Sequence, residues 1–237
     1  MIDLRCGDCL ELMKDIPDKS VDLILCDLPY GTTQCKWDSV IPFDKLWTQY
    51  NRIIKDNGAI VLFGVEPFTS CLICNNLKNY KYSWVWEKSK ATNYLNAKKQ
   101  PLRAFEDICV FYKKQPTYNP QMIQGKPYNK GTALRTTDVY GTQIATEVKN
   151  EDGLRYPRNV IYFKTAEAEG KVQHPTQKPV ALLEYLIKTY TNEGDTVLDN
   201  CMGSGSTGVA CKNTNREFIG MELDEKYYKI ACERLGA

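Results

Sequence analysis

Long hydrophobic runs are missing from this chain of 237 residues. No apolar stretch approaches the roughly 18 residues that cross a bilayer. The first residues, Met1-Ile2-Asp3-Leu4-Arg5, lack the layout of a secretory signal, and no internal repeat is present. Hydrophobic content of 43% and charged content of 25% are typical of one globular domain with insertions. We therefore expect a cytoplasmic protein with no membrane partner.

Histidine is scarce, because His174 is the only one. The ten cysteines include two pairs with the spacing of metal ligands, Cys6 with Cys9 and Cys71 with Cys74. The two pairs lie far apart in the sequence, and both lie far from His174. We expect no metal site. Many of the cysteines lie in apolar runs and are interpreted as small core residues in a reducing compartment.

Net charge is also low, at +2, but it is unevenly distributed. Between Lys78 and Arg135 there are 12 Lys or Arg and 3 acids, a local net of 12 − 3 = +9, which leaves −7 for the remainder. Ten aromatic residues share this stretch, and basic plus aromatic is the composition of a nucleic-acid groove. The alternative is a solvated lysine face over core aromatics, since the four aromatics from Tyr80 to Trp86 alternate along one face. The charge asymmetry favours a polyanionic partner.

Apolar periodicity predicts strands that alternate with helices, and hence an α/β fold with a mostly parallel, doubly wound sheet. Residues 115–173 differ, because they are rich in Gly, Pro, Thr, Asn and Lys and lack apolar periodicity. We interpret them as a loop-rich insertion that faces a partner. Strands are expected at 2–6, 21–26, 59–63, 80–86, 108–112, 196–198 and 217–221. Helices are expected at 9–14, 43–55 with a stop at Asn57-Gly58, 67–77, from Pro179, 208–212 and 224–235.

The tetrapeptide Asp27-Leu28-Pro29-Tyr30 follows one of these apolar strands. Pro29 cannot continue a central strand, so the chain turns and leaves Asp27 and Tyr30 at a carboxyl edge, where open α/β sheets bind ligands. A carboxylate accepts hydrogen bonds from an amino group, and an aromatic ring stacks on a flat base. The pattern suits the exocyclic amine of a nucleobase. The alternative is a strand that simply ends in a proline turn.

A second strand runs into Asp199 and a glycine-rich turn that leads to a helix at Thr207. Gly203 and Gly205 allow the backbone to approach a ligand and to adopt positive φ, and the helix N-terminus offers free N–H groups. Glu222 follows the next strand, 23 positions after Asp199. A carboxylate at that place binds ribose hydroxyls in dinucleotide folds, although the turn is not a dinucleotide fingerprint. We expect a nucleoside cofactor.

Three motifs together resemble a known family. Residues 27–30 resemble the catalytic Asp-Pro-Pro-Tyr of amino-group DNA methyltransferases, and residues 199–207 resemble their Asp-Pro-Phe-x-Gly-Ser-Gly-Thr cofactor motif. His174-Pro175-Thr176-Gln177-Lys178-Pro179 is similar to the box that precedes their cofactor strand. The order resembles the β group, a circular permutation of the Rossmann-like methyltransferase fold. Leu28, Asn200 and Cys201 depart from the family pattern, which puts loop rigidity and packing against the cofactor or target base in doubt.

The resemblance implies a catalytic domain of residues 1–114 and 174–237, with 115–173 as a target-recognition insertion. It implies S-adenosylmethionine as cofactor, double-stranded DNA as partner, and transfer to the N6 amine of a flipped-out adenine, since Asp at position 27 is typical of adenine enzymes. Asp27, Leu28, Pro29 and Tyr30 are then catalytic. The resemblance leaves open a homodimer and a partner nuclease in a restriction–modification system.

Cofactor roles carried over by resemblance cover the nucleoside and the methionine ends. Asp199, Gly203 and Gly205 hold the methionine part, Glu222 the ribose, Asp8 the adenine amine, and Thr176 and Lys178 the carboxylate. Two alternatives are a helix cap for Asp8 and a plain surface lysine for Lys178. Asp27, Cys9, Cys201, Ser204 and Leu223 complete the expected cofactor contacts. The expected DNA contacts are Lys88, Lys90, Asn93, Lys98, Lys99, Arg103 and Arg135, with Arg155 and Arg158 as further candidates for reading guanine.

Three alternatives stay open from the sequence. The chain methylates cytosine N4 or RNA, or it is a DNA-binding module whose pocket has decayed, as the departures at Leu28 and Cys201 suggest. A small-molecule methyltransferase is the third alternative, but such an enzyme has no need of the basic stretch from Lys78 to Arg135.

Overall fold

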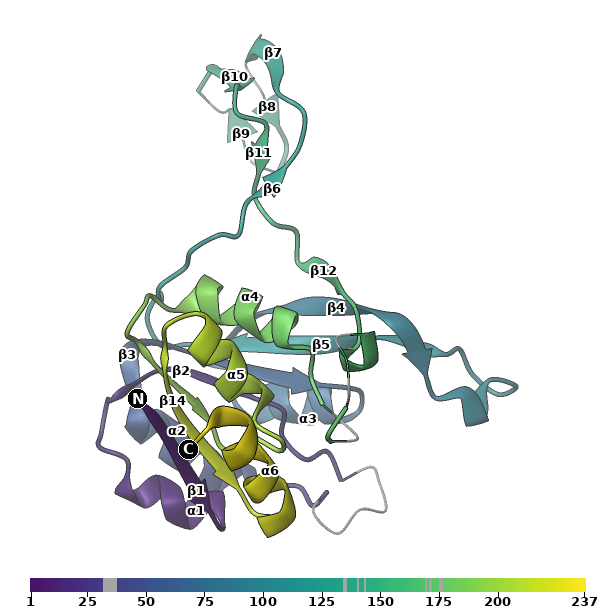
Figure 1. Ribbon diagram of the computed structural model, residues 1–237. Coiled ribbons are helices and arrows are strands. Elements are labelled where there is room, and N and C mark those ends of the chain that lie inside the picture. The colour runs from purple at the N-terminus through teal and green to yellow at the C-terminus, as the bar shows by residue number, and fades with distance from the viewer. Residues whose placement is uncertain are drawn as a thin grey trace. The chain divides into compact units, whose positions relative to one another are not determined.

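The computed structural model describes residues 1–31, 38–133, 136–139, 141–142, 144–168, 170, 172–174 and 177–237. The chain divides into two compact units, one of residues 1–119 with 159–237 and one of residues 120–158 (Figure 1). The first unit contains an eight-stranded sheet, and the second contains three short two-stranded pairs. Within the described ranges, every helix is too short or too polar to span a bilayer.

The main sheet has the strand order β1-β14-β13-β2-β3-β5-β4-β12. All neighbouring strands are parallel except at β5, which runs antiparallel to both β3 and β4. The predicted mostly parallel α/β sheet is therefore confirmed. The strands are β1 (Ile2–Cys6), β2 (Val21–Cys26), β3 (Ile54–Gly64), β4 (Tyr80–Thr92), β5 (Arg103–Phe111), β12 (Val160–Phe163), β13 (Thr196–Asp199) and β14 (Glu217–Glu222).

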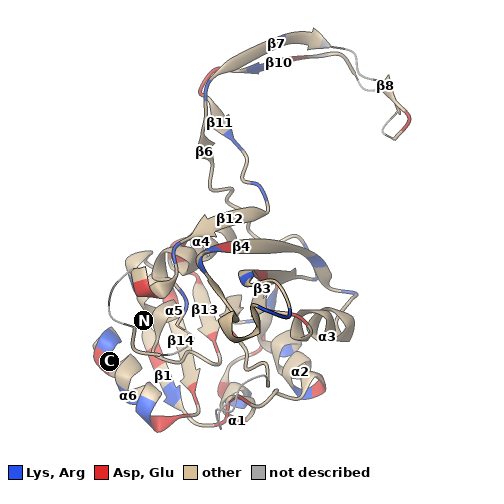
Figure 2. Ribbon diagram, turned by 90° about the vertical axis from the view of Figure 1, so that its right-hand side faces the viewer, with Lys and Arg blue, Asp and Glu red and all other residues tan. Residues whose placement is uncertain are grey.

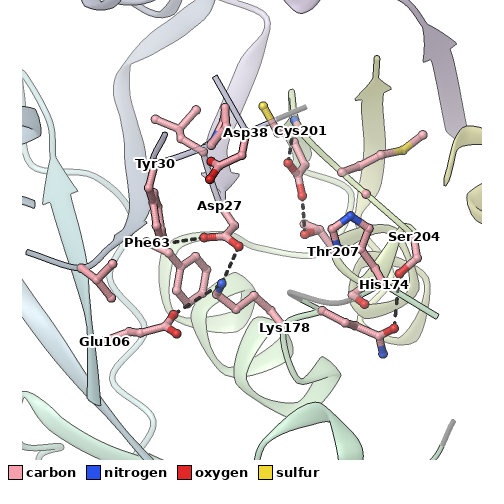
Figure 3. Close-up of a pocket in the computed structure, with 18 of the residues that line it drawn as sticks. Asp27, Tyr30, Asp38, Phe63, Glu106, His174, Lys178, Cys201, Ser204 and Thr207 are labelled. Atoms are coloured by element: carbon pink, nitrogen blue, oxygen red, sulfur yellow. Dashed lines mark hydrogen bonds and ion pairs between the residues drawn. The ribbon is translucent and has the colours of Figure 1, made fainter. Parts of the chain in front are cut away.

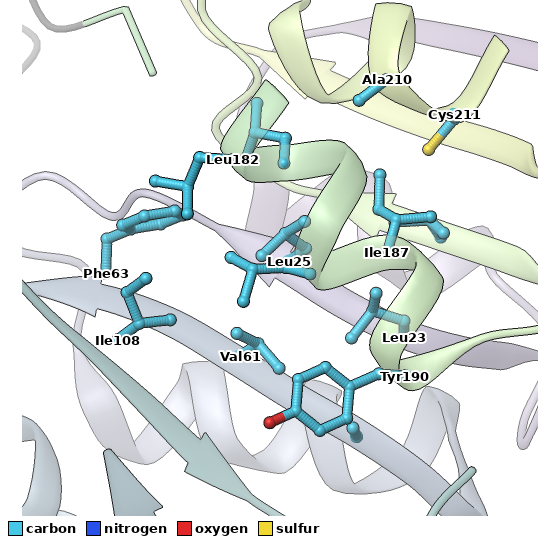
Figure 4. Packing of buried hydrophobic residues seen from close by; sticks show 14 of the residues in the cluster. Leu23, Leu25, Val61, Phe63, Ile108, Leu182, Ile187, Tyr190, Ala210 and Cys211 are labelled. Carbon is cyan, nitrogen blue, oxygen red and sulfur yellow. The ribbon is translucent and has the colours of Figure 1, made fainter. Parts of the chain in front are cut away.

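Helices cover both faces of this sheet, so β2 is buried on both sides. Leu23 and Leu25 pack in the cluster under α4, α5 and α6 (Figure 4), whereas Ile24 and Cys26 pack in the opposite cluster with α1, α2 and α3. This burial explains the continuous apolar run of β2. The helical elements are α1 (Cys9–Leu12), η1 (Met13–Asp15), α2 (Phe43–Ile53), α3 (Phe68–Asn75), η2 (Tyr94–Asn96), η3 (Ala166–Ala168), α4 (Val180–Tyr190), α5 (Ser206–Asn213) and α6 (Glu225–Leu235).

The predicted helix stop at Asn57-Gly58 is wrong. Helix α2 already ends at Ile53, and Asn57 and Gly58 lie inside β3, where the pairing register with β2 shifts. A Cβ atom on Gly58 would lie 2.8 Å from the Asp22 carbonyl oxygen, so the close approach of β2 requires glycine here. The expectation that cysteines in apolar runs are small core residues is wrong for Cys71 and Cys74, because both are exposed on α3.

The alternating aromatics of β4 form core rather than a stacking groove. Trp84 and Trp86 are buried, and the indole Nε1 of Trp84 donates a hydrogen bond to the Tyr190 hydroxyl at 2.7 Å. The Tyr82 and Tyr190 hydroxyls also share a hydrogen bond, at 2.9 Å. These contacts attach β4 to α4 and support the alternative stated for the aromatics of this strand.

The second unit, residues 120–158, lies within the stretch 115–173 that the sequence sets apart. Arg155 donates hydrogen bonds to Asn150 Oδ1 at 2.6 Å and to the Lys126 carbonyl, and its guanidinium lies 4.5 Å from the centre of the Tyr128 ring. Arg155 therefore stabilises its own unit rather than presenting a free fork to guanine. The strand pairs are β6 (Ile123–Gln124) with β11 (Leu154–Arg155), β7 (Tyr128–Ala133) with β10 (Thr146–Asn150), and β8 (Thr136–Thr137) with β9 (Gly141–Thr142).

Candidate active site

A cavity of about 760 Å³ opens at the carboxyl ends of β2, β13 and β14, within the first unit. Its walls include the loop of residues 27–30, the turn after Asp199, and the pair Glu222 and Leu223. Residues 7–10 after β1 complete this end of the cavity. Parallel strands bring these carboxyl ends to one edge of the sheet, so motifs far apart in the chain meet in one cavity (Figure 3).

Asp27 stands at the centre of a hydrogen-bonded cluster (Figure 3). Its Oδ1 accepts a hydrogen bond from the Tyr30 hydroxyl at 2.5 Å, and its Oδ2 accepts one from the Lys178 ammonium. The Tyr30 ring packs against Phe68 with ring centres 4.8 Å apart, and Lys178 Nζ lies 5.0 Å from the centre of the Phe63 ring. Both donors are thus held by packing as well as by the carboxylate.

A second carboxylate in this cluster has no counterpart in the sequence predictions. Glu106 Oε2 lies 3.4 Å from Lys178 Nζ, and Glu106 Oε1 accepts a hydrogen bond from Lys88 Nζ at 3.0 Å. The side chains of Lys88, Lys178, Glu106 and Asp27 are 5%, 10%, 14% and 20% exposed. Two carboxylates and two ammonium groups alternate in this buried row, so their charges balance. The one signal in the sequence is an isolated acidic pair within the basic stretch.

Burial and charge act in opposite directions on these groups. Burial raises the pKa of Asp27, and the ammonium of Lys178 opposes that rise. Burial also disfavours the charged form of Glu106, but the nearby ammonium groups of Lys178 and Lys88 hold its pKa below the usual range. Burial disfavours the ammonium form of Lys178 in turn, but the two carboxylates raise its pKa. The net effect raises the pKa of Asp27, and the ammonium of Lys178 is the main charge that favours its ionised form.

The Lys178 ammonium thus bonds to Asp27, and Lys178 also lines the cavity, so the contact with the cofactor carboxylate that the resemblance implies stays a prediction. The second residue expected there, Thr176, lies outside the described residues. Nearby, the Ser204 hydroxyl donates to Gln177 Oε1 at 3.3 Å. The His174 ring packs on Tyr227 at 4.1 Å between ring centres, and burial lowers the pKa of His174 to about 4, so this imidazole is neutral at pH 7.

Asp199 organises the glycine-rich turn from within. Its Oδ2 accepts from the Thr207 hydroxyl at 2.6 Å, and its Oδ1 accepts from the Cys201 backbone N–H at 3.1 Å. Burial raises its pKa to about 6. Where the family has proline, the Asn200 side chain accepts a hydrogen bond from the Tyr50 hydroxyl at 2.5 Å. The turn is therefore fully formed despite the departures at positions 200 and 201.

Glu222 connects that turn to the next strand. Its Oε2 accepts from the Gly203 N–H and its Oε1 from the Asp224 N–H, each at 2.8 Å. Gly203 has φ +52° and lines the cavity, as expected, whereas Gly205 does not line it. A Cβ atom on Gly205 would lie 3.1 Å from the Ala231 Cβ, so this glycine allows α5 to pack on α6 rather than a ligand to approach.

The remaining residues predicted to bind the cofactor all line the cavity, and one of them, Asp8, also caps a helix. Asp8 caps α1 by accepting from the Leu10 N–H at 2.8 Å, as the alternative proposed, and it also lines the cavity. It can therefore serve both roles. Cys9, Cys201, Ser204 and Leu223 are also cavity residues.

The predicted DNA contacts separate into four groups. Lys90, Asn93 and Arg103 line the cavity, whereas Lys98 and Lys99 are exposed on the turn beyond it (Lys and Arg are blue in Figure 2). Lys88 also lines the cavity, but its ammonium is buried and paired with Glu106, so a contact with a phosphate there stays a prediction. Arg135 lies outside the described residues.

Comparison with known proteins identifies the family to which a chain with this site belongs. A family model for N6 and N4 methyltransferases, described as DNA methylase, matches residues 21–233. The chain belongs to this family. It is 52% identical to the type II methyltransferase M2.DpnII of Streptococcus pneumoniae over 98% of this chain and 88% of that protein. It is 30% identical to the DNA adenine methyltransferase YhdJ of Escherichia coli strain K12 over 97% of this chain and 81% of that protein.

A solved structure shares the fold of the chain and carries the cofactor. The crystal structure of the M1.HpyAVI–SAM complex superimposes on this methyltransferase with a TM-score of 0.70 at 28% identity, over 100% of both chains. The cofactor of the methyltransferase is S-adenosylmethionine. The residues present fit it, because the Glu222 carboxylate is 8% exposed, lines the cavity, and retains lone pairs for a pair of ribose hydroxyls beside its two backbone bonds.

Proposed function

We propose that this methyltransferase transfers the methyl group to the N6 amine of adenine in double-stranded DNA. The observation that carries the proposal is the position of Asp27, a buried carboxylate at the carboxyl end of β2 that faces the cavity and forms an ion pair with Lys178. A carboxylate is a hydrogen-bond acceptor, which suits an exocyclic amine with its two N–H donors, on adenine N6 and on cytosine N4 alike. The adenine activity in the printed name of YhdJ supports adenine as the target base.

Asp27 and the Leu28 carbonyl form the acceptor pair in this mechanism. Each Asp27 oxygen already accepts one protein hydrogen bond, and a carboxylate has about four acceptor sites, so capacity remains for an amine N–H. Two acceptors on the amine favour a pyramidal nitrogen whose lone pair points away from the ring plane. Bound S-adenosylmethionine would supply an activated methyl group on its sulfonium: the S–CH3 bond breaks as the N–CH3 bond forms, S-adenosylhomocysteine leaves as the thioether, and the amine nitrogen then releases one proton. The task of the protein is then to hold the amine in line, and positioning supplies much of the acceleration.

The base must leave the duplex to reach Asp27, at a cost of a few kcal/mol. We propose that Tyr30 stacks on the extruded base, which is worth about 1–3 kcal/mol. Residues 120–158 are proposed as the unit that reads the DNA sequence. The catalytic strand β2 precedes the cofactor strand β13 in the chain, yet the two are parallel neighbours. This order supports the circular permutation of the β group.

The test is a product analysis with a matched variant. Duplex DNA is incubated with the protein and labelled S-adenosylmethionine, then digested to nucleosides and weighed. We expect N6-methyl-2′-deoxyadenosine from the natural chain. Asp27→Ala should give no label in DNA while cofactor binding, measured by calorimetry, is retained. N4-methylcytosine as the only product would refute the adenine assignment, and label from Asp27→Ala at the natural rate would refute the role of Asp27.

A further inference from the structure

The chain between β4 and β5 forms an exposed turn, and its exposed apolar side chains have no role in the cofactor binding expected above. Figure 1 shows β4 and β5 extending together beyond the helices to η2. At the tip, Tyr94 and Leu95 are 76% and 83% exposed. The turn begins at Asn93, which adopts φ +69°, and the Asn96 side chain donates a hydrogen bond to Asn93 Oδ1 at 2.7 Å.

The surroundings of these two side chains are basic. Lys90, Lys98, Lys99 and Arg103 all lie between residues 89 and 105, and that segment of the sequence contains no Asp or Glu. An apolar tip within a basic rim is complementary to duplex DNA, where phosphates flank a stack of apolar base faces. A second copy of the chain would place one basic rim against another, so like charges argue against self-association through this turn.

The turn also lies beside the entrance that the target base uses. Asn93 and Tyr94 line the catalytic cavity, whereas Leu95 is the neighbouring residue that does not. A base that moves into the cavity leaves a gap in the stack, and an apolar or aromatic side chain in that gap offsets the lost stacking. The position of the tip at the cavity rim allows one short turn to act on both sides of the extruded base.

We propose that Tyr94 and Leu95 form a wedge that enters the duplex and fills the space left by the flipped base, while Lys98 and Lys99 hold the flanking phosphates. The inference rests on the proposed function, because only an enzyme that extrudes its target needs a wedge. In this proposal Tyr94 and Leu95 keep the neighbouring bases apart. The exposed lysines alone would not do so, because phosphate contacts position the protein on DNA but do not separate bases.

The experiment compares Leu95→Ala and Tyr94→Ala with the control Leu77→Ala. Leu77 is 66% exposed, follows α3 and does not line the cavity. Each protein methylates two duplexes with the same target site, one fully paired and one with an abasic position opposite the target base. We expect the wedge variants to lose about tenfold or more in kcat/KM on the paired duplex and to regain most of it on the abasic one. Leu77→Ala should match the natural chain on both.

Several results would overturn the wedge. They are an equal loss on both duplexes, no loss on the paired duplex, or a change in sedimentation coefficient for Leu95→Ala but not for Leu77→Ala, which would assign the tip to self-association. Failure of the proposed function looks different. In that case the natural chain itself gives no N6-methyl-2′-deoxyadenosine on either duplex, whatever the tip contains. Calorimetric binding of S-adenosylmethionine confirms that each variant is folded.

Discussion

Replacing Lys178 with methionine tests whether the charge beside Asp27 controls the reaction. The substitution keeps the length of the side chain and removes its ammonium, which bonds to Asp27 Oδ2 and lies 3.4 Å from Glu106 Oε2. Two carboxylates then share a buried site with Lys88 as their only ammonium partner among the described residues. Removing one partner of a buried ion pair costs about 3–5 kcal/mol, and a carboxyl group avoids part of that cost by taking up a proton.

The sign of the effect follows from the causes of the pKa of Asp27. Burial raises that pKa and Lys178 lowers it, so Lys178→Met should raise it further. Asp27 then becomes neutral at a pH where it is ionised in the natural chain, and a neutral carboxyl group accepts the amine less well. We expect the acidic limb of the profile of kcat/KM against pH to move to higher pH. The loss of rate should be largest at the acidic end and smaller as pH rises.

Glu106→Gln is the matched variant with the opposite sign. The charge of Glu106 raises the pKa of Asp27, so its removal should move the acidic limb to lower pH. The assay is transfer of labelled methyl groups to duplex DNA across a pH series, with cofactor binding measured at each pH. If the acidic limb stays in place in Lys178→Met, or if both variants move it in the same direction, electrostatic control of Asp27 by this cluster is refuted.

Three further predictions concern stability. Burial raises the pKa of Asp199 from 3.8 to about 6, so the unfolded chain loses this proton at lower pH than the folded chain does, and the free energy of unfolding of the natural chain falls as pH rises through that range. Asp199→Asn removes this titration, so its free energy of unfolding relative to that of the natural chain should rise by roughly 3 kcal/mol between pH ~4 and ~7. Urea unfolding at each pH measures the difference, and a difference that does not change with pH would contradict the prediction. Gly205→Ala should cost about 1–3 kcal/mol because φ is +78° and the Ala231 Cβ lies 3.1 Å away, whereas Gly236→Ala, with φ +69° and open space, should cost less in thermal unfolding. Tyr190→Phe should cost about 1–3 kcal/mol because it leaves the buried Trp84 N–H without its acceptor, and Tyr82→Phe should cost less; equal losses would show that the two bonds do not differ.

Local patterns in the sequence predict the framework of the site. Apolar runs followed by Asp27, Asp199 and Glu222 predict strands that end in carboxylates, and parallel strands bring their carboxyl ends to one edge, where the cavity lies. These features are readable because periodicity and turn residues are local signals. The helix stop at Asn57-Gly58 failed for a related reason: the same two residues serve a bulge, and only pairing with β2 distinguishes the two uses.

The tertiary structure alone decided which charges act together. The register of β5 on β4 sets Glu106 opposite Trp86, and this pairing brings Glu106 to Lys88, 18 residues away, and to Lys178, 72 residues away. The same packing turns Lys178 toward Asp27, across 151 residues of chain. Ion pairs of this kind leave no periodic trace in a sequence, because a buried charge is positioned by whichever elements pack around it.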